Sequence, residues 1–326
     1  GDGVNDAPAL KEADIGVSMG LEGTEVAKGA SDMILTDDNF CSIVKAVKKG
    51  RVIYSGIEKF VSFIMSVHFA EVLQIFLCVV IGLPIMRQPL QILFLVLVTD
   101  LPPAIALGVE PAEDGIMSHK PRPKTQPVVL PWMWRCIVAN GVIITMTIMA
   151  TYLVALHAYA GNFYQDDIIR DTRKSCVIWR RSAMFSRVRY YDDDDDKIDL
   201  CKKFSIRRAR TVAFIALVWA ENLRAYTARS FTKPFYIKMF NNPAMNKAVL
   251  IAQIALYTCL FVPGLSTAVL GLFWDEIHWW GWVIAIFGAL STLVGCEIFK
   301  FVASKFPEVE FVEKAPVKAE AAEKKV

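Results

Sequence analysis

Residues 90–108 read LQILFLVLVTDLPPAIALG, an apolar run that contains a polar pair, Thr99 and Asp100, followed by two prolines. A helix of about 20 apolar residues spans the hydrocarbon core of a bilayer. An ionisable side chain within such a helix is costly to bury and is therefore a candidate functional group. This stretch predicts a membrane helix with a polar site partway along it.

The rest of the chain repeats this apolar pattern. Of its 326 residues, 54% are hydrophobic, and a mean hydropathy of +0.38 is too high for a soluble domain of this length. We expect a mostly α fold, a polytopic helical membrane domain with six transmembrane helices. The predicted spans are residues 57–82, 90–108, 132–157, 211–228, 247–272 and 280–303.

The first 50 residues differ from the rest in having soluble-domain character. Residues 1–50 combine β-like runs at 15–19 and 33–35 with a helical run from Phe40 to Arg51. This alternation is typical of the end of an α/β domain. Because the chain opens at Gly1 without a starting Met or a signal peptide, we expect it to begin inside a domain.

The polar segments predict the topology of the membrane domain, residues 51–305. Lys and Arg residues gather in the loops 110–131 and 224–247, which places these loops and both ends of the chain on the cytoplasmic side. The long polar loop 158–210 then lies on the exoplasmic side. The Ala-, Glu- and Lys-rich tail, residues 306–326, is predicted to be a disordered cytoplasmic segment.

Charge and metal-ligand patterns exclude two other classes of protein. The net charge of +3 comes from 36 basic and 33 acidic residues, a balance that does not favour nucleic-acid binding. Seven cysteines have no zinc-like spacing, and four histidines are scattered. We therefore expect a lipid bilayer as partner and no nucleic acid or zinc module.

Two neighbouring spans carry the polar groups of a candidate cation site. His68, Glu71 and Gln74 recur every three residues and share one helical face. Thr99 and Asp100 precede prolines that cannot continue the helical hydrogen-bond ladder, which frees carbonyl oxygens beside them. Carboxylate, hydroxyl and carbonyl oxygens suit a hard cation. The alternative is structural: carboxylates that are protonated or paired, and His68 and Gln74 hydrogen-bonded to a neighbouring helix.

The first eleven residues, GDGVNDAPALK, combine two carboxylates, an amide and two glycines. Glycines let the backbone approach a phosphate, carboxylates suit Mg²⁺, and Asn can donate to a phosphoryl oxygen. The residues alone leave a second interpretation open, an acidic glycine-rich turn without ligand.

This string, together with the segments 27–40 and 50–54, resembles the hinge region of P-type cation-transporting ATPases of the calcium- and sodium-pump branch. The resemblance implies a HAD-like phosphorylation domain that leads into the last six of ten membrane helices. It implies Asp2 as a Mg²⁺ ligand, Asn5 as a phosphate contact and Asp6 as a second acidic group near the metal. ATP would be bound mainly by the rest of the pump, since no Asp-Lys-Thr-Gly-Thr string supplies the phosphorylated aspartate here.

The resemblance extends to the membrane spans, through residues 67–72 and 98–111. It implies Glu71, Thr99 and Asp100 as ligands of the transported cation, at positions used by reticulum-type calcium pumps. His68 and Val96 stand where those pumps have Asn. The matching ligands favour Ca²⁺ as the transported cation, and the departures at His68 and Val96 keep Na⁺ or H⁺ as the alternative.

The fourth span ends in the polar residues Glu221, Asn222, Arg224 and Arg229. One interpretation is a cluster at the membrane interface, with long side chains reaching toward water. The other follows from the resemblance, which implies that Arg229 lies close to where calcium pumps have a further acidic ligand; a guanidinium there would replace one bound cation.

Two cysteines bracket the exoplasmic loop, Cys176 and Cys201. The resemblance implies a disulfide between them, because calcium-pump relatives have one in the equivalent loop and only this pair would meet an oxidising compartment. If the loop faced the cytosol, both would be free thiols.

The sequence is also compatible with two other classes of protein. An ATP-independent channel or secondary transporter would also place carboxylates at mid-membrane, but it gives no reason for the Gly1 to Lys11 string. A regulatory membrane subunit would suit the absence of catalytic segments. The sequence does not identify an accessory subunit.

Overall fold

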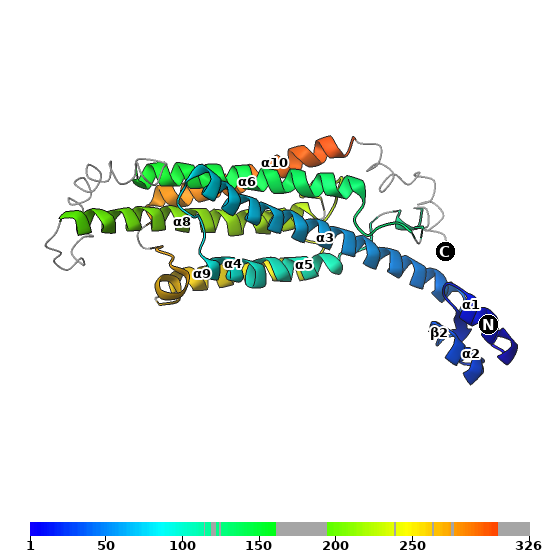
Figure 1. Ribbon diagram of the computed structural model, residues 1–326. Coiled ribbons are helices and arrows are strands. Elements are labelled where there is room, and N and C mark those ends of the chain that lie inside the picture. Colours follow the sequence, from blue (N-terminus) through cyan, green and yellow to red (C-terminus); the bar gives the residue numbers. More distant parts are fainter. Residues whose placement is uncertain are drawn as a thin grey trace. The chain divides into compact units, whose positions relative to one another are not determined.

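The computed structural model describes residues 1–113, 115–118, 122–123, 125–160, 194–237, 239–262, 264–274 and 277–305 (Figure 1). The described residues fall into two compact units. The first contains residues 1–55 and 112–118, and the second contains the remaining described residues, from 56 to 111 and from 122 onward.

The first unit is built around a small β-α-β element. Strands β1 (Val17–Met19) and β2 (Met33–Leu35) pair in parallel, with Val17 opposite Met33. Helix α2 (Glu25–Ala30) connects them, and its N-terminus is capped by the Thr24 hydroxyl, which accepts from the Ala27 amide. Both strands lie inside the runs predicted from sequence. The short helices η1 (Val4–Asp6) and α1 (Ala7–Glu12) precede them.

Asp38 holds the loop that follows β1. Its backbone φ is +49°, and its carboxylate accepts from the amides of Gly20, Leu21 and Glu22 at 2.6, 3.0 and 2.8 Å. These N–H donors, those of Leu21 and Glu22 first, lower the pKa of the Asp38 carboxyl below its ordinary value. A single side chain therefore fixes the loop at the carboxyl end of the strand.

Helix α3 (Cys41–Ile81) is a single helix of 41 residues. The sequence predicted two helices there, Phe40 to Arg51 and 57–82, and no proline separates them. In the second unit, α3 crosses the end of α5 at Gly56, where an added Cβ would lie 2.9 Å from the Gly108 carbonyl oxygen. The absence of a side chain at Gly56 allows this close backbone approach.

The second predicted span is a helix with an altered middle. It consists of α4 (Pro89–Phe94), the π-helical turn η2 (Leu95–Asp100) and α5 (Leu101–Gly108). The π turn ends directly before Leu101-Pro102-Pro103. Since proline lacks the N–H that an α ladder requires, the change of hydrogen-bond pattern at this point has a direct chemical cause.

The remaining long elements are α6 (Pro131–Ala160), α8 (Asp194–Thr227), α9 (Pro243–Phe261), the π turn η5 (Leu265–Leu270) and α10 (Trp279–Ala303). Helix α9 ends earlier than the predicted limit at 272. Gly264 has a φ of +92° and Gly271 a φ of +63°, conformations that an α-helix does not contain.

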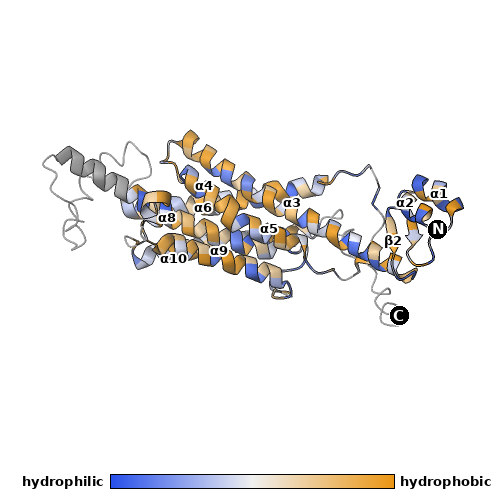
Figure 2. Ribbon diagram, turned by 90° about the horizontal axis from the view of Figure 1, so that it is seen from below, coloured by the Kyte–Doolittle hydropathy of each residue, from blue (hydrophilic) through white to orange (hydrophobic). Residues whose placement is uncertain are grey.

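Helices α6, α8 and α10 pack on one another, and α5 packs on α9 (Figure 1). Almost every side chain of α8 from residue 208 to its end is buried. The outward faces of other helices expose large apolar side chains, as at Val72 and Phe76 on α3 and Phe287 and Ile298 on α10. Hydrophobic residues predominate along most of the helices of the second unit (Figure 2). Such continuous apolar surface is suited to lipid.

Five of the described helical segments are long and apolar enough to cross a membrane: Cys41–Ile81, Pro89–Gly108, Pro131–Tyr159, Pro243–Phe261 and Trp279–Ala303. The predicted span 211–228 lies almost entirely within α8 but is not among them. Glu221, Asn222 and Arg224 lower its hydropathy, although the surrounding helices bury these side chains. The chain is thus a multi-pass helical membrane protein.

Candidate cation site

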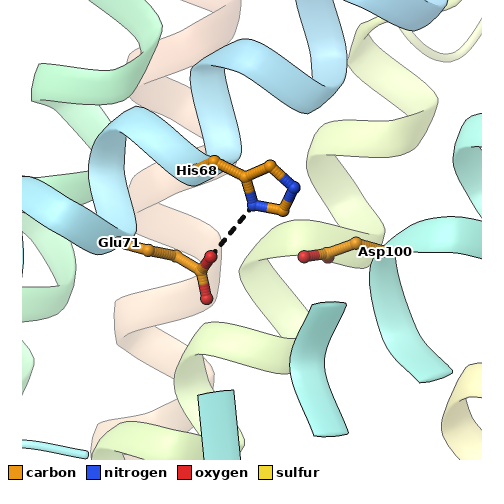
Figure 3. A group of neighbouring side chains, drawn as sticks. All are labelled: His68, Glu71 and Asp100. Atoms are coloured by element: carbon orange, nitrogen blue, oxygen red, sulfur yellow. Dashed lines mark hydrogen bonds and ion pairs between the residues drawn. The ribbon is translucent and has the colours of Figure 1, made fainter. Parts of the chain in front are cut away.

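The α3 side of the site is the face that carries His68, Glu71 and Gln74. His68 Nδ1 lies 3.0 Å from Glu71 Oε2 (Figure 3). Glu71 and Gln74 are buried, and His68 is partly exposed. The helical spacing of three residues brings the side chains together, as the sequence predicted.

Asp100 approaches these residues from the end of η2 (Figure 3). One ligand atom each of His68, Glu71 and Asp100 lie within 4.8 Å of one another, close enough for one ion to contact all three. Asp100 is fully buried, and no described residue donates a hydrogen bond to either of its carboxylate oxygens, which lie against the Glu221 carboxyl instead. A buried carboxylate without partners is unfavourable unless a cation or a proton joins it.

Thr99 lies beside Asp100 in the same turn. Its hydroxyl is buried and donates to the Leu95 carbonyl at 2.8 Å. The oxygen keeps a lone pair, so that it can still serve as a neutral ligand.

Glu221 adds a third carboxylate from α8, which packs against η2. In the part of the chain that the structure describes, no donor bonds its two buried oxygens, and both polar atoms of the buried Asn222 side chain lack a partner. Glu221 is within electrostatic range of Asp100 and Glu71. The interpretation of Glu221 and Asn222 as an interface cluster is wrong, because these side chains are 1% and 3% exposed. The signal in the sequence was a glutamate within an apolar run.

Arg229 does not enter this group of residues. Its Nε and Nη2 donate to Glu110 Oε1 at 2.9 and 2.7 Å. The Glu110 carboxylate also accepts from Asn242 Nδ2 at 2.6 Å. The expectation that Arg229 places a guanidinium near the cation site is therefore corrected: its guanidinium joins the ends of α5 and α8 to the start of α9.

Arg87 supplies a guanidinium instead, and the sequence analysis missed it. Arg87 lies in the loop between α3 and α4 and is buried. It donates to Glu71 Oε1 at 2.9 Å, to the Glu71 carbonyl at 3.2 Å and to Gln74 Oε1 at 2.6 Å. An arginine in a short loop between two apolar spans was the available signal.

The group holds three carboxyls, those of Glu71, Asp100 and Glu221, and one guanidinium, that of Arg87. Arg87 neutralises Glu71, while Asp100 and Glu221 keep two carboxyls in a region enclosed by apolar helices. The neutral Thr99 hydroxyl and Asn222 amide are their neighbours in the sequence, and the carboxyls and these groups are rich in oxygen. Such a set can bind a hard cation from the interior of the protein.

The Gly1 to Lys11 string occupies one edge of the first unit. The Gly1 nitrogen donates to the Val17 carbonyl and the Met19 amide donates to the Gly1 carbonyl, at 2.9 and 3.1 Å, in the pattern of a parallel neighbour of β1. Asp2 follows at the carboxyl end of these strands and is exposed, as is Asn5. Ligands of parallel α/β sheets bind at this end, so the Asp2 carboxylate could hold Mg²⁺ there.

Asp6 shapes the same loop. Its Oδ2 accepts from the amides of Asp2 and Gly3 at 2.8 and 3.0 Å. These donors, Gly3 first, lower the pKa of the Asp6 carboxyl below its ordinary value. The carboxylate therefore orders the backbone next to Asp2.

The predicted disulfide lies outside the described residues, because neither Cys176 nor the side chain of Cys201 is among them. Within the part of the chain whose side chains are described, the cysteines are free thiols, namely Cys41, Cys78, Cys136, Cys259 and Cys296.

Comparison with known proteins identifies the family of the chain. Residues 83–302 match the sequence model of a family described as cation transporting ATPase, C-terminus. A sodium-transporting P-type ATPase4 of Plasmodium falciparum is 33% identical over 91% of this chain and 30% of its own length. Calcium-transporting ATPase 1 of Bacillus cereus is 34% identical over 92% of this chain and 30% of its length.

A third relative is the endoplasmic reticulum calcium ATPase srcA of Aspergillus fumigatus, 35% identical over 88% of this chain and 28% of its length. The chain thus spans about three-tenths of the length of these relatives. Since the family match covers most of the chain, the protein belongs to the P-type cation-transporting ATPases.

Proposed function

We propose that this chain is the part of an ATP-driven cation pump that holds the transported cation within the membrane. The observation that carries the proposal is the pair of buried carboxyls, Asp100 and Glu221, which lie near each other and Glu71 and receive no hydrogen bond from a donor among the described residues. The cation ligands are Glu71, Thr99 and Asp100, with His68 and Glu221 completing the group.

The transported cation is proposed to be Ca²⁺. Carboxylate and hydroxyl oxygens suit it, and two of the relatives above are named as calcium-transporting. Na⁺ is the alternative, supported by the relative named as sodium-transporting and by the partial neutralisation of the site by Arg87. Proton export is the weaker alternative and rests on His68.

The energy would come from phosphorylation of an aspartate in another part of the pump, with ATP as substrate. Asp2 and Asp6 belong to residues 1–50, proposed to be the end of a HAD-like phosphorylation domain. Asp2 would hold Mg²⁺, which neutralises charge on the transferred phosphoryl group. Asn5 would contact the phosphate, and Asp6 would keep the loop in place through the Asp2 and Gly3 amides.

The proposed topology has six spans within residues 51–305, with α8 as the fourth. Burial of α8 among its neighbours supports this count, since a helix shielded from lipid tolerates polar residues. Both ends of the chain, including residues 306–326, and the Lys- and Arg-rich loops would lie in the cytoplasm. The loop 158–210 would lie on the exoplasmic side.

Phosphoenzyme formation tests this function. The full-length pump in native membranes is incubated with labelled ATP and Mg²⁺, with Ca²⁺, with Na⁺ or with neither. We expect Ca²⁺ to activate formation of an acid-stable, hydroxylamine-sensitive phosphoenzyme. Activation by Na⁺ alone would change the proposed ion. Absence of any phosphoenzyme under all three conditions would refute the ATP-driven function and favour a channel or secondary transporter.

A further inference from the structure

The Glu71 carboxylate is fully engaged in this conformation. Oε1 accepts from Arg87 at 2.9 Å, and Oε2 lies 3.0 Å from His68 Nδ1. The Arg87 side chain is 1% exposed and bonds the Glu71 carbonyl and Gln74 as well. A guanidinium keeps its proton at any physiological pH. A fixed positive charge therefore lies within the group proposed to bind a positive ion.

Coulomb repulsion disfavours simultaneous binding of the Arg87 guanidinium and the transported cation to Glu71. An ion bound to this carboxylate would lie within a few ångströms of the guanidinium, and the repulsion between them grows in proportion to the charge of the ion. Because Arg87 cannot release its charge by deprotonation, Arg87 has to move when an ion takes Glu71.

Arg87 lies on a segment that can be displaced independently of a helix. The residues between α3 and α4 are non-helical, and they begin at Gly82 with a φ of +77°. Two side chains from other helices hold this loop: Tyr152 Oη donates to the Pro84 carbonyl at 2.8 Å, and Arg210 Nε donates to the Ile85 carbonyl at 2.6 Å.

We propose that Arg87 is a tethered counter-cation that competes with the transported cation for Glu71. This inference rests on the proposed function and adds a residue that sets the affinity and valence preference of the site. With the guanidinium on Glu71, that carboxylate is neutralised without an ion. When the ion takes Glu71, the guanidinium leaves, and Asp100 and Glu221 hold the other side of the ion.

Removal of the guanidinium tests the competition. In the full-length pump, Arg87→Gln should strengthen apparent Ca²⁺ affinity by at least about tenfold, because the competitor is lost and the buried Glu71 carboxylate is left uncompensated. The logarithmic shift for Na⁺ should be about half that for Ca²⁺, as the repulsion scales with ionic charge. Affinity is read from the Ca²⁺ or Na⁺ concentration that suppresses phosphorylation by inorganic phosphate.

A second readout does not depend on phosphorylation. Without added cation, detergent-solubilised Arg87→Gln pump should unfold at a lower temperature than wild type, and Ca²⁺ should raise its midpoint more than it raises that of wild type. Arg87→Lys retains the charge and should remain closer to wild type. Arg229→Gln is the matched control: it makes the same change at a buried arginine that pairs with Glu110 instead of Glu71 and does not touch this loop, and it should keep wild-type cation affinity.

The outcomes separate this inference from the proposed function. If wild type responds to cations but Arg87→Gln binds Ca²⁺ no more tightly, Arg87 is structural and the inference is overturned while the function stands. If wild type itself responds to neither ion, the proposed function fails and the inference with it. If Arg87→Gln fails to fold, Gln74→Met tests the inference instead, because it removes one hydrogen-bond partner of Arg87. Gln74→Met should strengthen Ca²⁺ affinity by a smaller factor than Arg87→Gln. An unchanged affinity would overturn the proposed competition.

Discussion

Replacement of Arg229 by methionine would leave the Glu110 carboxylate without its counter-charge. Both side chains are nearly buried, 8% and 10% exposed, and Nη2 lies 2.7 Å from Oε1. Asn242, which also bonds Glu110, caps the start of α9 by accepting from the Met245 amide at 3.1 Å. Loss of one partner of such a pair costs roughly 3–5 kcal/mol, because the remaining charge stays buried.

The expected effect is a lower melting temperature. A domain of this size loses roughly 2–4 °C per kcal/mol, so Arg229→Met should lower the midpoint by about 10 °C in a fluorescence-detected melt of detergent-solubilised protein. The double variant Arg229→Met, Glu110→Met removes both charges and should recover roughly half of the loss. A double variant at least as unstable as Arg229→Met would refute the view that Arg229 acts through Glu110.

Three further predictions concern other parts of the chain. Asp2→Asn in the full-length pump should reduce Mg²⁺-dependent phosphorylation by at least about tenfold, since one anionic metal ligand is lost; near-normal turnover would contradict the assignment. The lowered pKa of Asp38 means that its bonds stabilise the loop above pH about 4 and are lost as pH falls through the lowered pKa. In Asp38→Asn, hydrogen exchange should accelerate at Glu22, which bonds Oδ2, more than at Leu21, which bonds Oδ1; equal acceleration would count against this geometry. Non-reducing peptide mapping should recover Cys176 linked to Cys201, whereas alkylation of both without reductant would argue for free thiols.

Helix positions in the membrane domain follow closely from hydropathy, because lipid requires long apolar segments. The exact ends of the helices were less predictable where they depend on backbone hydrogen bonding or on an unusual backbone conformation. The π turn before Pro102 and the early end of α9 near Gly264 depend on hydrogen-bond pattern and a positive φ, which hydropathy does not measure. The sequence predicted two helices where the structure has the single helix α3. The sequence changes from polar to apolar between Arg51 and residue 57, which suggested a boundary, but the residues there still favour a helix.

The candidate site was predictable only along single helices. Periodicity placed His68 and Glu71 on one face, and an ionisable residue in an apolar run marked Asp100. The approach of Glu221 depends on how α8 packs against η2, and the position of Arg87 depends on the path of a loop. Both are contacts between segments far apart in the sequence, and single-sequence patterns carry no information about them.

The central claim is that the membrane carboxyls bind the transported cation, and Asp100→Asn tests it most directly. A cation ligand shifts the pump between conformations only through its differential affinity for them. The matched control is Glu297→Gln, the same change at a carboxylate that pairs with Lys300 at 2.7 Å, which should retain cation activation.

Phosphorylation of the Asp100→Asn pump is measured from ATP with Ca²⁺ and from inorganic phosphate without it. We predict loss of cation-activated phosphorylation from ATP, with phosphorylation from inorganic phosphate intact, because the second reaction uses the cation-free state. Wild-type cation activation in Asp100→Asn would contradict the claim and return Asp100 to a structural role.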